Sequence, residues 1–112
     1  MSLERLNSYH IMWLLVMFDL PTVTKQEKKY SAKFRKELEK DGFGMHQFSV
    51  YARFCASLES ANVHIKRVRS FVPSKGKVSI LKITDKQYSE IINIWGAVEE
   101  KKRPTPMQLE FF

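Results

Sequence analysis

The carboxylate of Asp19 is the side chain whose place in the sequence most clearly suggests chemistry. It directly follows the apolar run at residues 11–18 and precedes a rigid Leu-Pro pair. Mg²⁺ prefers oxygen ligands but takes several of them, so one carboxylate alone makes a poor site. If a two-fold axis passes near Asp19, two copies of the chain together can hold one ion, which would activate water for phosphodiester hydrolysis. The alternative is that Asp19 caps the turn into the helix that follows.

Other arrangements for catalysis are weaker. Tyr51 could stack on a substrate or hydrogen-bond to it, although a strand aromatic usually belongs to a core or an interface. Cys55 has only Arg53 as an activating neighbour and is more typical of a small buried residue. The sequence has no glycine-rich phosphate loop. The histidines lack metal-ligand spacing among themselves and with Cys55: His10, His46 and His64.

Positive charge predominates in this chain and is unevenly distributed. Lys and Arg number 19 against 12 acids, for a net charge of +7, and no acid lies between Glu59 and Asp85. A one-sign stretch in a folded domain repels itself and usually has an anionic partner. Nucleic acid is our main interpretation; an anionic membrane, an acidic protein or a solvated surface are the alternatives. The residues expected to contact phosphates are Lys25, Lys28, Lys29, Lys33, Lys36, Lys66, Arg67, Arg69, Lys75 and Lys77.

The length of 112 residues fits one domain with one core, and hydrophobic residues make up 44% of the chain. A single cysteine excludes a disulfide within the chain, so a reducing cytoplasm is the expected compartment. The apolar run at residues 11–18 is far too short to span a bilayer, and the first residues lack the pattern of a secretory signal. We therefore expect no membrane-spanning segment and, with nucleic acid as the main interpretation, no membrane partner.

Apolar patterning predicts a series of strands and helices. The run at residues 11–18 is typical of a buried central strand. Thr24 and Glu27 form a capping box that begins a helix over residues 25–41, which Gly42 ends. A second helix begins after Ser57 or Ser60, and Thr84 with Gln87 begins a short helical turn. Further strands are predicted over residues 45–54, 78–83 and 91–95.

We interpret the order as β-α-β-β-α-β, the ferredoxin-like arrangement of the α+β class, with two helices on one face of an antiparallel sheet. The chain divides into an N-terminal extension (residues 1–10), the ferredoxin-like domain (residues 11–98) and a linker with a C-terminal docking strand (residues 99–112). We expect residues 108–112 to add a strand to a sheet edge, that of the partner in a homodimer, rather than to fray. Trp13 and Trp95 are expected in the core.

Four segments in this order resemble the family of CRISPR-associated protein 2. They are FDLP at residues 18–21, KFRK at 33–36, GFGMHQFSVYAR at 42–53 and QLEFF at 108–112. The resemblance covers the chain from about residue 11 to its end and is closest to the variants of type II systems. It implies a ferredoxin-like homodimer in which the C-terminal strand completes the sheet of the partner.

The resemblance implies two activities. One is a scaffold role in spacer acquisition, in which the dimer bridges dimers of the CRISPR-associated protein 1 integrase and holds double-stranded DNA. The other is a metal-dependent endonuclease acting on RNA or double-stranded DNA. A toxin-like ribonuclease outside any CRISPR system is a third hypothesis, based on fold analogy alone.

The resemblance also assigns individual residues. The metal-binding aspartate of the family falls on Asp19, so that one Mg²⁺ per dimer is implied. A Ser-Val-aromatic motif falls on residues 49–51, and a basic helix position falls on Lys33. Some nuclease-active relatives carry Arg where this chain has Met45, a departure that counts against RNA cleavage here.

Overall fold

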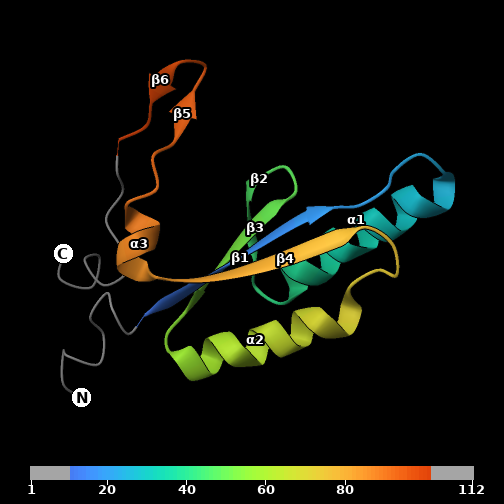
Figure 1. The fold of residues 1–112 in the computed structure, drawn as a ribbon, viewed down its shortest axis with the longest axis horizontal. Coiled ribbons are helices and arrows are strands. Elements are labelled where there is room, and N and C mark those ends of the chain that lie inside the picture. The colour runs from blue at the N-terminus through green and yellow to red at the C-terminus, as the bar shows by residue number, and fades with distance from the viewer. Residues whose placement is uncertain (1–10, 102–112) are drawn as a thin grey trace.

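The apolar run becomes β1 (Met12–Asp19), which lies in the interior of a four-stranded antiparallel sheet. A computed structural model describes residues 11–101 of the chain (Figure 1). The sheet order is β2-β3-β1-β4, with β1 paired to β3 on one side and to β4 on the other. The other elements of this sheet and its two long helices are α1 (Lys25–Lys40), β2 (Gly44–Gln47), β3 (Val50–Cys55), α2 (Leu58–Phe71) and β4 (Lys77–Thr84).

The ferredoxin-like order is confirmed, but one strand pair replaces the long strand predicted over residues 45–54. That segment is a hairpin, in which β2 and β3 pair antiparallel across a tight turn at Phe48 and Ser49. Ser49 adopts the left-handed conformation, with φ of 71°. The segment lacks Pro or Asn as a turn signal, and its aromatic and β-branched residues are typical of a continuous strand.

The strand predicted over residues 91–95 is also wrong, because it does not join the main sheet. It follows the short helix α3 (Asp85–Ser89), and only its last two residues are extended, as β5 (Ile94–Trp95). This strand pairs with β6 (Val98–Glu99). This two-stranded hairpin projects away from the sheet (Figure 1). Trp95 is 67% exposed instead of lying in the core, and Trp13 is only partly buried, with its ring stacked on Tyr88.

The core lies between the sheet and the two long helices, which cover one face of the sheet (Figure 1). Strand alternation sends Leu14, Val16 and Phe18 of β1 to that face, where they pack with Phe34 and Leu38 of α1. The opposite face of β1 carries Trp13, Leu15, Met17 and Asp19. The helices α1 and α2 therefore cover the face of β1 that carries Leu14, Val16 and Phe18, and neither of them covers the face that carries Asp19.

Local capping signals are confirmed where the sequence predicted them. Thr24 accepts a hydrogen bond from the N–H of Glu27, whose carboxylate accepts from the N–H of Thr24, so α1 begins with a complete capping box. Ser57, rather than Ser60, caps α2. Thr84 begins α3 with a second capping box. Gly42 follows α1 with φ of 89°, as expected for a helix stop.

The predicted extension over residues 1–10 and the predicted docking strand over residues 108–112 lie outside the described residues. They stay predictions, as does the domain boundary between residues 98 and 99. Within residues 11–101, no helix combines the length and the apolar character that a membrane crossing requires.

Substituting Thr24→Ala is expected to lower the free energy of unfolding by about 1 kcal/mol, because it removes the side-chain acceptor for the first turn of α1. Urea denaturation followed by circular dichroism measures the change. Thr22→Ala is the matched control, since Thr22 is exposed and makes no hydrogen bond with a described residue. An equal effect of both substitutions would contradict the assigned role of Thr24.

Candidate metal and nucleic-acid site

Asp19 is an exposed carboxylate at the carboxyl end of β1. Its side chain makes no hydrogen bond or ion pair with any residue in the described part of the chain. The alternative that Asp19 caps the following helix is wrong, because Thr24 occupies that position. No neighbour within the described fold therefore accounts for the charge of Asp19.

The turn before β4 fixes the backbone at Asp19. Gly76 has φ of +90°, and a Cβ atom at this position would lie 2.6 Å from the carbonyl oxygen of Asp19 and 2.9 Å from Leu20 Cδ2. Only a residue without a side chain allows this approach. No pattern in the sequence predicts that Gly76 would lie against Asp19, because the two residues are far apart along the chain.

A second contact fixes β1 from the other side, through the β2–β3 hairpin. The N–H of Phe18 donates to the carbonyl of Ser49 at 3.0 Å, and the guanidinium of Arg35 donates to the Ser49 hydroxyl at 3.1 Å. The same guanidinium lies 3.9 Å from the ring centroid of Phe48 and 4.9 Å from that of Phe18. Its Nη1 is buried and has no hydrogen-bond partner among residues 11–101. Cation–π contacts of this kind hold the left-handed turn against the end of β1.

Sequence analysis did not single out Arg35. Within the KFRK segment, Arg35 is one of several cationic residues on a basic helix. Which face of α1 points toward the hairpin depends on tertiary packing, so no local signal separates Arg35 from its neighbours.

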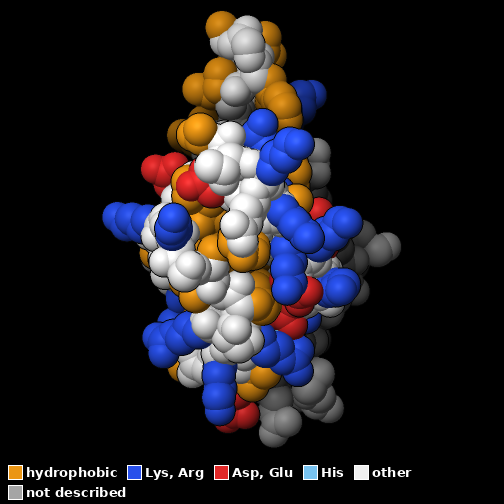
Figure 2. Space-filling model, turned by 90° about the vertical axis from the view of Figure 1, so that its right-hand side faces the viewer, with side chains coloured by type: hydrophobic (Ala, Val, Ile, Leu, Met, Phe, Trp, Pro, Cys, Tyr) orange, Lys and Arg blue, Asp and Glu red, His pale blue; other side chains and the backbone are white. Residues whose placement is uncertain are grey.

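All ten basic residues predicted to contact phosphates are exposed. Figure 2 views the molecule from the end where β1 finishes, and Lys and Arg side chains surround this end with few acids among them. Lys77 is the register partner of Asp19 on the adjacent strand, and Lys75 lies in the turn that contacts it. All but Arg67 lack an ion pair with a described residue.

Arg67 belongs instead to a charged cluster at the end of α1. Its Nη1 lies 3.0 Å from Asp41 Oδ1, and the Nδ1 of the buried His64 lies 2.7 Å from Asp41 Oδ2. Arg53 Nε donates to the carbonyl of Asp41 at 2.7 Å. Asp41 thus links α1, α2 and β3, and this contact gives both His64 and Arg67 a structural role.

Tyr51, proposed above as a weak catalytic candidate, is fully buried in the core. Its hydroxyl lies 3.4 Å from Glu39 Oε1, and its side chain has no exposed surface with which to reach a substrate. Cys55 is also buried, and this desolvation raises the pKa of its thiol, which stays protonated at neutral pH. The structure therefore brings Tyr51 and Cys55 into the core and leaves Asp19 at the surface.

A metal ion at Asp19 would need ligands beyond those that the described part of the chain supplies. Among residues 11–101, no group of three or more His, Cys, Asp or Glu side chains is close enough to hold a metal ion. A carboxylate oxygen suits Mg²⁺ in kind, and a second copy of Asp19 with phosphate and water oxygens would complete such a ligand set. Residues 11–101 therefore supply Asp19 as one ligand of a kind that fits Mg²⁺, but not a complete ligand set.

The comparisons with known proteins agree with the fold. The family model described as CRISPR associated protein Cas2 matches residues 12–91. A protein of Flavobacterium psychrophilum named CRISPR-associated endoribonuclease Cas2 is 48% identical over 108 residues, 96% of this chain and 94% of that protein. Proteins with the same name from Parvibaculum lavamentivorans (48% over 101 residues, 90% and 100%) and Paracidovorax avenae (42% over 107 residues, 96% and 99%) are also similar to it.

Gly76→Ala is expected to destabilise the fold by at least about 1 kcal/mol, because it adds left-handed strain to a clash with Asp19. Chemical denaturation measures this loss, and the backbone amide of Asp19 is expected to shift in NMR spectra. Gly44→Ala is the matched control, since its added Cβ would meet nothing within 4 Å. Unchanged stability and an unchanged Asp19 amide in Gly76→Ala would contradict this account.

Proposed function

Because the chain belongs to the CRISPR-associated protein Cas2 family, we propose that it is a magnesium-dependent endoribonuclease that acts as a homodimer. The observation that carries this proposal is the exposed Asp19 carboxylate, which no described residue pairs and which no helix uses as a cap. Its relatives are named endoribonucleases, and a carboxylate at a strand end beside exposed lysines suits hydrolysis of a phosphodiester.

The sheet face that carries Asp19 supports a dimer. Within the described chain, α1 and α2 lie on the other face, and α3 contacts this face through Asp85 and Tyr88, at Trp13 and His46. Met17 is 37% exposed and Leu81 is 45% exposed on this face, in one apolar strip with Leu15. A second copy related by a two-fold axis matches such a strip with an identical one. If this axis passes near the end of β1, the two Asp19 side chains face each other.

Each part of the proposed site then has a chemical task. The paired Asp19 carboxylates hold the metal ion, which when bound lowers the pKa of water and offsets charge on the phosphate. Lys77 is the register partner of Asp19 on β4 and is available to bind a phosphate group of the substrate. The lysines of α1 extend this phosphate contact along the chain of the nucleic acid.

The second candidate function is a scaffold that holds double-stranded DNA for the CRISPR-associated protein 1 integrase in the cytoplasm. The observation that favours it is the spread of exposed lysines and arginines well beyond Asp19, onto α1 and α2. Such a surface binds the phosphate backbone without reading sequence, and the scaffold role requires no metal chemistry at Asp19.

Asp19→Asn is expected to lower magnesium-dependent cleavage of single-stranded RNA at least about a hundred-fold, because the amide keeps the size of the side chain but removes the charge that binds the metal. Gel analysis of labelled RNA measures the rate. Glu59→Gln serves as the control, since Glu59 is an exposed acid on α2 without an ion pair to a described residue. Equal cleavage by wild type and Asp19→Asn would show that the activity lies elsewhere.

Salt dependence tests the proposed phosphate contacts on either nucleic acid. Lys29→Gln is expected to reduce the slope of log affinity against log salt concentration by about one, because one fewer counterion is released on binding. Fluorescence anisotropy with an RNA strand and a DNA duplex measures the slope. Lys40→Gln is the control on the same helix, since Lys40 pairs with Glu37 at 3.7 Å. If Lys29→Gln keeps the wild-type slope, Lys29 does not contact phosphate.

A further inference from the structure

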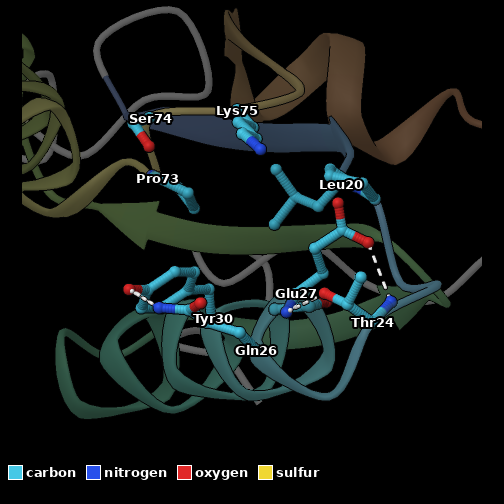
Figure 3. A pocket seen from close by; sticks show the side chains of 10 residues that line it. Leu20, Thr24, Gln26, Glu27, Tyr30, Pro73, Ser74 and Lys75 are labelled. Atoms are coloured by element: carbon cyan, nitrogen blue, oxygen red, sulfur yellow. Dashed lines mark hydrogen bonds between the residues drawn. The ribbon is translucent and has the colours of Figure 1, made fainter.

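A pocket of about 390 Å³ lies immediately behind the end of β1. The segment after Asp19 and the first two turns of α1 form one side of it, and the turn before β4 forms the other (Figure 3). Leu20 lines the pocket, and the turn that lines it is the same turn whose Gly76 touches Asp19. The pocket therefore adjoins the proposed metal site, and neither the metal site nor the phosphate contacts use it.

Two oppositely charged groups face this pocket. Glu27 Oε1 accepts hydrogen bonds from the N–H groups of Val23 and Thr24 at 3.1 and 2.9 Å, while its Oε2 accepts none from a described residue. The Thr24 N–H chiefly lowers the pKa of Glu27, against a smaller opposing effect of desolvation, and the charge of Lys75 adds to the lowering. Figure 3 shows Lys75 entering from the turn and Glu27 from the helix below it.

The remaining lining combines apolar and aromatic side chains with neutral polar ones. Leu20 and Pro73 project into the pocket from one side, and the ring of Tyr30 lies on the other (Figure 3). The Tyr30 hydroxyl accepts a hydrogen bond from Gln26 at 2.7 Å, which limits the movement of the ring. Flat apolar walls with a few oriented polar groups are typical of sites for planar ligands.

We propose that this pocket is a subsite for an unstacked guanine base of the RNA substrate. Guanine offers two adjacent N–H donors on the edge that would face the free oxygen of Glu27, and acceptor oxygen and nitrogen atoms that suit Lys75. Its flat faces suit Tyr30 and Pro73, as unpaired RNA bases commonly stack on aromatic side chains. Adenine places a ring-nitrogen acceptor where guanine has N1–H, so it meets Glu27 less favourably.

The location explains why the occupant is part of a nucleic acid chain. The α1 residues that line the pocket are neighbours in sequence of the exposed Lys25, Lys28 and Lys29, which would be available for the phosphates on either side of a base. This inference rests on the proposed endoribonuclease function, since the base would be held one short segment away from Asp19. It assigns to that function a base preference, which the metal site alone does not provide.

The test uses the Asp19→Asn protein, which keeps the RNA uncut, without magnesium. The probes are two fluorescein-labelled eight-residue oligouridines, one with a central guanine and the other with a central adenine. Fluorescence anisotropy is expected to show about five-fold or tighter binding of the guanine strand. An added Glu27→Gln substitution is expected to abolish this preference while retaining α1, since Gln at this position still completes a capping box.

Lys25→Gln is the matched control, because Lys25 is an exposed cation on the same turn of α1 but does not line the pocket. It should weaken both strands equally and keep the guanine preference. Equal binding of the two strands by the Asp19→Asn protein, or a guanine preference that survives Glu27→Gln, overturns the proposal. Cleavage by the wild type is measured separately, so a failed nuclease with retained guanine preference contradicts only the nuclease function.

Discussion

The contact between Gly76 and the backbone of Asp19 is the constraint on which the candidate site depends. Within one residue, β1 passes from Phe18, buried against the helices, to Asp19, exposed at the sheet end. The turn before β4 lies against this point on one side, and the Ser49 hairpin with Arg35 holds Phe18 on the other. The carboxylate is thereby placed on a rigid backbone, as a shared metal ligand requires. The same turn also forms one side of the adjoining pocket.

The second determinant of the candidate site is the distribution of charge around the end of β1. The acids near the ends of α1 are engaged: Glu27 in the capping box and Asp41 with His64 and Arg67. Within the described chain most of the lysines have no such partner, so the surface around the end of β1 carries an excess of positive charge that would favour a polyanion. Asp19 is an exception within this surface, because it is an exposed acid without a described partner. A cation bound there would remove the repulsion between Asp19 and a phosphate.

Sequence predicted the features that depend on local signals. The capping boxes at Thr24 and Thr84, the helix stop at Gly42 and the apolar strand were all recognisable from adjacent residues. The hairpin in residues 45–54 was missed, because the turn at Ser49 relies on Arg35 and Phe18 rather than on turn residues. The exposure of Trp95 was missed too, since apolar composition alone does not tell a core strand from a projecting hairpin.

The site itself could be predicted only in part. Asp19 and the exposed basic residues followed from type and order, whereas Gly76, Arg35 and the pocket depend on which segments meet in space. Tyr51 illustrates the limit of strand patterning, because its residue type allowed both a core position and contact with a substrate, and only the fold shows that its side chain is completely buried. Burial is a property of the packed sheet and is not visible in a strand taken alone.

The central claim is that two chains share one metal ion through Asp19. The most direct test counts bound Mn²⁺, as a paramagnetic substitute for Mg²⁺, by electron paramagnetic resonance on protein whose mass is determined by sedimentation. We expect a dimer that binds one ion per two chains and that loses this ion, but not the dimer, in Asp19→Asn. One ion per chain, or Mn²⁺ binding unchanged in Asp19→Asn, would contradict the claim.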